Sequence, residues 1–117
     1  MKKLCAIRDI CRALGEFEND FLNEYGISLN EGMVLCSLKE SRLSSGEIAK
    51  QVNLTCSNTS KLIRAIEDRG YIERVLGEED RRQMYFLLTS TGTAKLQEIE
   101  NNSIPLTGPL KKLLSFK

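Results

Sequence analysis

The chain has 117 residues, enough for one domain with a single hydrophobic core. Hydrophobic residues make up 41% and charged residues 28%, and no apolar run reaches the ~20 residues of a membrane span, so we expect a cytoplasmic protein without a membrane partner. The net charge is +1, with six basic and six acidic residues between positions 55 and 82, so bulk charge does not favour nucleic-acid binding.

The residue types that are missing argue against several kinds of function. Histidine is absent, and neither a phosphate-binding glycine loop nor a clustered carboxylate pair is present, so we expect no catalytic residues and no enzyme. The four cysteines lack the spacing of a zinc finger or zinc ribbon. We therefore expect no metal site and no cofactor.

Apolar periodicity predicts that the first part of the chain is helical. Residues 2–23 carry apolar side chains at spacings of three and four, which predicts an amphipathic helix that ends before Gly26. At about 30 Å for 20 residues, this helix is long for a small domain, so a second subunit would cover part of its apolar face. A second helix is predicted over Glu31–Glu40, with Cys36 in the core.

Two short helices with a tight turn between them are predicted next. Ser44 and Glu47 form a capping-box pattern, which predicts a helix over Ser45–Gln51. Asn53 tolerates the left-handed backbone of a tight corner, and the following helix is predicted over Cys56–Arg69. The pair is either a DNA-binding helix-turn-helix or an ordinary helical pair in a core.

A hairpin and two further helices complete the prediction. Tyr71–Leu76 and Gln83–Thr89 are rich in strand-forming residues and are joined by a polar segment, residues 77–82. Thr89 or Ser90 would cap a fifth helix that ends near Ser103. A last short helix is predicted over Pro109–Phe116.

The run from Asp80 to Gly92 resembles the D-x-R-x-x-x-V-x-L-T-x-x-G signature of MarR-type transcription regulators, with Phe86 in place of the usual valine. The resemblance covers about residues 29–99 and implies a mainly α fold with a small β-hairpin, a winged helix-turn-helix. It also implies a homodimer that binds a pseudo-palindromic operator in double-stranded DNA. Within one domain, 1–117, residues 1–26 and 92–117 would be dimerisation helices. Residues 29–91 would be the DNA-binding core, with the wing at about 71–89.

The resemblance and the residue chemistry together suggest DNA contacts. By position, Arg82 would enter the minor groove, whose electronegative potential suits arginine, and Asp80 would orient Arg82 or brace the hairpin. By the same resemblance, Arg74 and Arg81 would be phosphate contacts. Asn58 can bond adenine and Ser57 can bond several bases, whereas cationic side chains and a helix N-terminus suit phosphates. The alternative for each residue is a solvated surface side chain. The predicted DNA-binding set is Thr55, Ser57, Asn58, Ser60, Lys61, Arg64, Arg74, Arg81 and Arg82.

Other functions stay open at this point. The neutral charge of residues 55–82 fits a winged helix used as a protein–protein adaptor. Some MarR-type relatives sense peroxides through a first-helix cysteine, so Cys11 is a candidate redox residue. Cys56 is another, because the positive end of the recognition helix favours a reactive thiolate. The alternative is that these thiols are buried or idle. The resemblance further implies a small-molecule effector and, most simply, a repressor.

Overall fold

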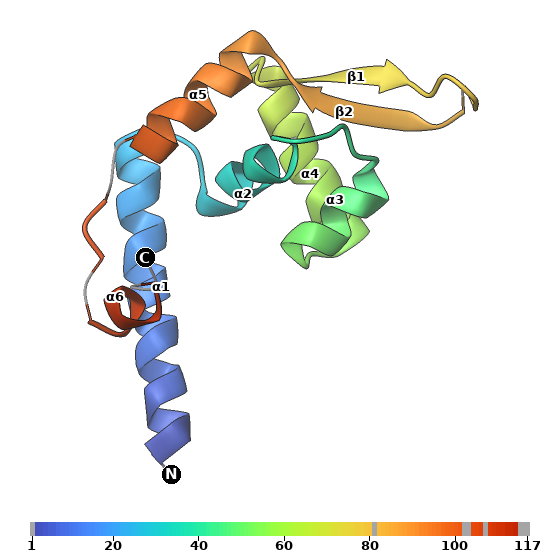
Figure 1. Ribbon diagram of the computed structural model, residues 1–117. Coiled ribbons are helices and arrows are strands. Elements are labelled where there is room, and N and C mark those ends of the chain that lie inside the picture. Colours follow the sequence, from blue (N-terminus) through green and yellow to red (C-terminus); the bar gives the residue numbers. More distant parts are fainter. Residues whose placement is uncertain (1, 81, 102–103, 107, 115–117) are drawn as a thin grey trace. The chain divides into compact units, whose positions relative to one another are not determined.

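The computed structural model describes residues 2–80, 82–101, 104–106 and 108–114. The elements in order are α1 (Lys2–Tyr25), α2 (Leu29–Ser37), α3 (Ser45–Val52), α4 (Cys56–Asp68), β1 (Ile72–Leu76), β2 (Met84–Leu88), α5 (Ser90–Asn101) and α6 (Gly108–Leu113) (Figure 1). This confirms the predicted fold class, mainly α with a small hairpin. The chain divides into two compact units, one with α1 and α6 and the other with α2 to α5 and the hairpin. The predicted single domain with flanking dimerisation helices stays a prediction.

The unit of α1 and α6 exposes much of its apolar surface. Phe21 and Tyr25 are buried, and their rings meet edge to face with centroids 4.8 Å apart. Gly26 ends α1 in the left-handed region, at φ +74°, as predicted. α6 ends at Leu113, and the predicted end at Phe116 lies outside the described residues. The large apolar side chains exposed in this unit are Leu4, Ile7, Leu14, Leu22, Leu113 and Leu114.

The α3–turn–α4 segment follows the predicted local rules. The Ser44 hydroxyl accepts from the Glu47 N–H at 3.2 Å, and the Glu47 carboxylate accepts from the Ser44 N–H at 2.9 Å. Asn53 ends α3 with φ 56° and ψ 48°, the left-handed conformation. On α4, Ile63 and Ile66 are buried, and α4 packs against α3. The helix-turn-helix geometry is therefore present.

The predictions for α2 were wrong in two details. The helix ends at Ser37 and not at Glu40, because the Lys39 N–H bonds the Cys36 carbonyl at 3.2 Å, a tight final turn of the 3₁₀ type. Cys36 is exposed and not in the core. Val34 and Leu38 face the core, and Cys36 lies two residues from each, about 200° around the helix.

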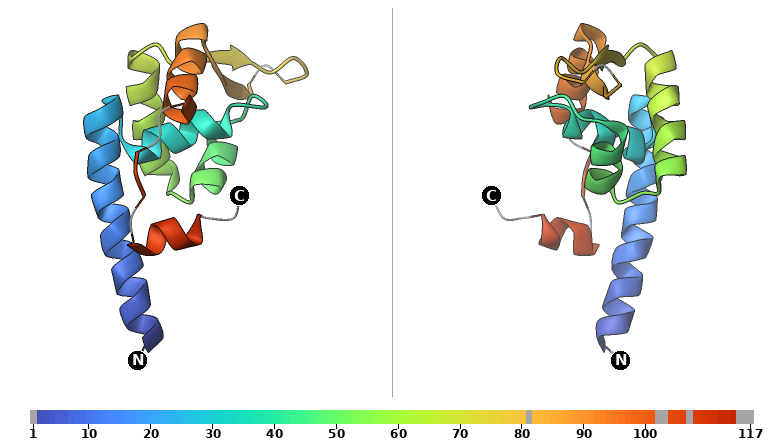
Figure 2. Two further views of the ribbon diagram at one scale, coloured as in Figure 1. Left: turned by 60° about the vertical axis from the view of Figure 1, so that its left-hand side comes forward. Right: turned by 90° about the vertical axis from the view of Figure 1, so that its right-hand side faces the viewer.

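The hairpin forms a regular antiparallel pair that extends away from the helices of its unit (Figures 1 and 2). Its register runs from Ile72 opposite Leu88 to Leu76 opposite Met84, so the strands are slightly shorter than predicted. Phe86 is also bonded to Leu43 in the α2–α3 connector. The two residues exchange backbone hydrogen bonds of 2.8 and 3.1 Å. The base of the wing is thereby joined to the segment that precedes α3.

Thr89 and Gly92 lie at the close approach between the hairpin and α5. The Thr89 hydroxyl donates to the Gly70 carbonyl at 2.6 Å and accepts from the Gly92 N–H at 3.0 Å, so Thr89 caps α5 as predicted. A Cβ atom on Gly92 would lie 2.8 Å from the carbonyl carbon of Tyr71. The contact leaves room for glycine alone. The predicted end of α5 near Ser103 lies outside the described residues.

Candidate nucleic-acid interface

The outer face of α4, together with its N-cap residue Thr55, carries six of the nine predicted DNA-binding residues. Thr55 has an extended backbone, and its hydroxyl accepts from the Asn58 N–H at 3.1 Å, which fixes where the helix begins. The other side of the helix is buried through Thr59, Ile63 and Ile66. Polar and basic side chains therefore share the solvent side of α4. The exposed predicted residues are Thr55, Ser57, Asn58, Ser60, Lys61 and Arg64.

The wing tip presents Arg82 to solvent. Its side chain is 93% exposed, with its Nε 3.4 Å from the Asp80 carboxylate. The same carboxylate oxygen accepts from the Arg82 backbone N–H at 3.0 Å. Asp80 thus contacts both the backbone and the side chain of Arg82, the geometry expected of a residue that orients it. Arg81 lies outside the described residues.

Arg74, another of the predicted contacts, is engaged in an ion pair within the fold. Its Nε and Nη2 donate to the two carboxylate oxygens of Glu67 at 2.6 and 2.8 Å. Its guanidinium also lies over the Phe86 ring, 5.6 Å from the centroid. The hydrogen bonds that Arg74 donates to Glu67, followed by the charge of Glu67, raise the pKa of Arg74 above its ordinary value. Glu67 was not predicted from sequence as the partner of Arg74, although their opposite charges on the two sides of the Gly70 turn were a visible signal.

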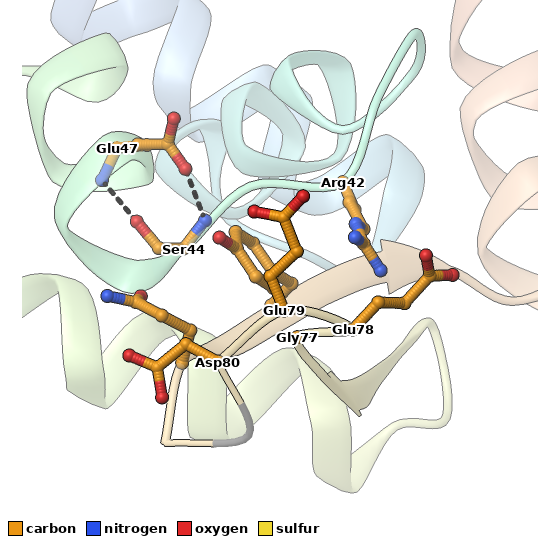
Figure 3. A pocket seen from close by; sticks show the side chains of 9 residues that line it. Arg42, Ser44, Glu47, Gly77, Glu78, Glu79 and Asp80 are labelled. Carbon is orange, nitrogen blue, oxygen red and sulfur yellow. Dashed lines mark hydrogen bonds between the residues drawn. The ribbon is translucent and has the colours of Figure 1, made fainter.

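A cavity of about 540 Å³ separates the start of α3 from the wing (Figure 3). The Arg42 guanidinium lies 4.7 Å from the centroid of the Tyr85 ring. Hydrogen bonds from Ser44 lower the pKa of Glu47 below its ordinary value, so this carboxylate is charged at neutral pH. Four of the nine described lining residues are acidic and one is basic, so the cavity is poorly suited to phosphate. The lining consists of Arg42, Ser44, Glu47, Gly77, Glu78, Glu79, Asp80, Gln83 and Tyr85.

The cysteines and the carboxylates do not form a metal site in the described part of the chain. In those residues no group of three or more histidine, cysteine or acidic side chains could hold a metal ion. Cys11 and Cys56 are both exposed, and Cys56 lines a groove of about 620 Å³ between α3 and α4. A redox role for either thiol stays a prediction. None of the described helices combines the length and the hydropathy that crossing a membrane requires.

The capped α3–turn–α4 pair followed by a hairpin defines a winged helix-turn-helix protein. Residues 27–84 match the model of the MarR family. The transcriptional regulator PrsX of Escherichia coli is 36% identical over 84 residues, which cover 69% of this chain and 51% of PrsX. The transcriptional repressor YetL of Bacillus subtilis is 33% identical over 78 residues, which cover 62% of this chain and 47% of YetL. The chain belongs to the MarR family.

Solved structures agree with this assignment at the level of the fold. The crystal structure of an S. aureus MepR–DNA complex superposes with a TM-score of 0.65 at 23% identity, over 81% of this chain and 79% of that one. The chain spans about half the length of the curated relatives it matches. The relatives quoted are named as transcriptional regulators and not as enzymes.

Proposed function

We propose that the protein is a homodimeric transcription regulator that binds a pseudo-palindromic operator in double-stranded DNA. α4 enters the major groove, and Arg82 of the wing enters the adjacent minor groove. One observation carries the proposal. The same unit presents the polar, N-capped face of α4 and an arginine side chain that is 93% exposed at the tip of the hairpin.

The residue types on these two surfaces match the chemistry of DNA. Asn58 can bond both N6 and N7 of adenine, and Ser57 can bond a base edge or a phosphate. Lys61 and Arg64 are exposed cations on the same helix, suited to phosphates. Thr55 and Ser60 complete the set on α4, and Arg81 would contact a phosphate beside the wing. The MepR neighbour is described as a DNA complex, which supports the same use of the fold.

A homodimer accounts for the exposed apolar surface of α1 and α6. Leu4 and Ile7 are 62% and 55% exposed, and Leu113 of α6 is 56% exposed. A second copy that covered these side chains would remove apolar area from water, which favours association. Two copies related by a two-fold axis would read two half-sites of one palindrome.

Selection of bound duplexes from a random pool tests the proposal. We expect a palindrome with half-sites about one helical turn apart and an affinity that falls steeply with salt. Arg82→Ala should weaken binding markedly. Arg8→Ala should not, because it removes an exposed arginine from α1 instead of the wing. Failure to bind any duplex at low salt would reject the proposal.

Regulation completes the proposal. We propose that the protein is a cytoplasmic repressor that a small molecule or an oxidant releases from DNA. The oxidant version uses Cys11 on α1 or Cys56 at the start of α4, both exposed thiols. Peroxide would then weaken DNA binding of the wild type. An unchanged peroxide response in both Cys11→Ser and Cys56→Ser would eliminate the cysteine version.

The second candidate function is a winged-helix adaptor for another protein. The balance of six basic and six acidic residues between positions 55 and 82 favours it. The salt titration separates the two candidates, because an adaptor has no steep salt-dependent affinity for duplex DNA.

A further inference from the structure

We infer that Glu67 and Arg74 act as a pair of positioning residues, which fix the wing relative to the recognition helix α4. The inference rests on the proposed DNA-binding function. It gives Arg74 a different role from the phosphate contact predicted from sequence. It also gives Glu67, an acidic residue, a supporting role in binding to an anionic ligand.

The geometry of the Glu67–Arg74 pair is directional. Two parallel hydrogen bonds of 2.6 and 2.8 Å join the guanidinium to both carboxylate oxygens. A bidentate pair of this kind fixes orientation as well as distance. Glu67 lies in the last turn of α4, and Arg74 lies in the middle of β1, seven residues further on. The pair therefore closes the corner between the recognition helix and the wing.

The pair is joined to the second strand and to the segment before α3. Arg74 and Phe86 are direct cross-strand neighbours, and the guanidinium lies over the Phe86 ring. Phe86 is 5% exposed, and its backbone exchanges two hydrogen bonds with Leu43. Along the chain, the corner contains Gly70 at φ +81°, a residue with wide backbone freedom. The ion pair limits that freedom, so it helps to set the distance between α4 and the wing tip.

The cost of breaking the pair argues against Arg74 as a phosphate contact. The Glu67 side chain is only 18% exposed, whereas the Arg74 side chain is 52% exposed. If Arg74 turned to a phosphate, a partly buried carboxylate would lose its partner close to an anionic ligand. Two DNA-contacting surfaces held at a fixed separation gain affinity from preorganisation. Both considerations favour retention of the pair in the DNA-bound protein.

The test compares Glu67→Gln, Arg74→Gln and the double variant in salt titrations on a selected duplex. We expect each single variant to bind roughly tenfold more weakly, and the double variant to be no weaker than the singles, since contacting residues couple. The slope of log K against log salt should not change. The control is Glu73→Gln, which removes a neighbouring exposed carboxylate from β1 and should not weaken binding.

A phosphate contact gives the opposite pattern. Arg74→Gln alone would then lower the salt slope by about one unit, and Glu67→Gln would leave affinity unchanged or raise it. That result would overturn the inference. The charge-reversed double variant, Glu67→Arg with Arg74→Glu, should recover part of the affinity lost in the singles. No recovery, together with additive losses in the Gln variants, would also count against the pair.

Amide hydrogen exchange supplies a readout that does not involve DNA. We expect faster exchange in the β1 and β2 amides of both single variants, with unchanged exchange in the buried part of α4. Unchanged exchange in the hairpin would overturn the positioning role even if DNA binding fell. If the wild type bound no duplex, the proposed function would fail. The exchange experiment would still show whether the pair orders the wing.

Discussion

Replacement of Thr59 by valine tests how α4 is held in the core. Thr59 is 1% exposed, and its hydroxyl has no hydrogen-bond partner among the described residues. A buried polar group left unpaired costs about 1–3 kcal/mol, and valine keeps the shape of the side chain with a methyl group in place of the hydroxyl. The helix propensities of the two residues are similar. We expect Thr59→Val to raise the free energy of unfolding by about 1–2 kcal/mol.

Thr55→Val is the matched control, because it makes the same substitution four residues earlier in the chain. The Thr55 hydroxyl accepts a hydrogen bond from the Asn58 N–H, so valine removes the N-cap of α4. Loss of such a cap costs about 1 kcal/mol. The two substitutions therefore change stability in opposite directions, although both replace a threonine of the α4 segment by the same residue.

Urea denaturation followed by circular dichroism measures both effects. The protein concentration must be equal in all samples, because the proposed dimerisation would make apparent stability depend on concentration. The expected result is a higher midpoint for Thr59→Val and a lower one for Thr55→Val, with equal m-values. If Thr59→Val lowered the midpoint as much as the control, the hydroxyl would contribute to stability and the reasoning would be refuted.

Three further predictions address the hairpin corner, the α3 cap and the wing. Gly92→Ala should destabilise the fold by at least about 2 kcal/mol in thermal unfolding, because its Cβ would overlap the Tyr71 carbonyl; a wild-type midpoint would contradict the close approach. The folded-state pKa of Glu47 lies below its ordinary value of 4.5, so its capping contribution is present above that pH and is lost as pH falls further. Glu47→Gln should therefore weaken the loss of unfolding free energy at acidic pH. An unchanged pH dependence would mean that Glu47 is not its source. Glu78→Gln with Glu79→Gln should tighten duplex binding by removing repulsion at the wing; unchanged affinity would mean that these carboxylates face away from DNA.

Rules that act within a few residues predicted the helix-turn-helix well. The Ser44–Glu47 capping box, the left-handed Asn53 and the Thr55 cap all depend on atoms at most four residues apart. The chemistry of such short segments is visible in the sequence. The same holds for Thr89 as the cap of α5, although its bond to the Gly70 carbonyl is long-range.

Pairings that depend on how the hairpin returns to the helices were not predicted. The bridge between Leu43 and Phe86 joins positions with no local pattern in common. The register of the hairpin decides which face of β1 carries Arg74, and therefore whether Arg74 faces Glu67. Residue spacing does not specify that register. Cys36 was misplaced for a related reason. A short apolar run such as residues 33–36 fits more than one helix face, and tertiary packing selects one.

The apparent neutrality of residues 55–82 has a local explanation in these pairings. Arg74 is paired with Glu67, and the Arg69 Nε lies 3.9 Å from the Glu31 carboxylate, so two of the six basic residues pair with largely buried carboxylates. Arg82 also lies beside a carboxylate, that of Asp80, but its side chain is 93% exposed. In contrast, no ion pair involves Lys61 or Arg64 in the residues that the structure describes.

The charges that remain for a ligand are thus unevenly distributed. α4 presents Lys61 and Arg64 beside its exposed hydroxyl and amide groups, and the wing presents Arg82. Glu78 and Glu79 lie together with Asp80 at the cavity between the wing and α3. In the proposed function, affinity for DNA therefore depends on where each charge is held, and the net charge of the segment is a poor guide to it. This is why the Glu67–Arg74 pair matters: a residue that holds the wing in place can affect binding as much as a residue that contacts the duplex.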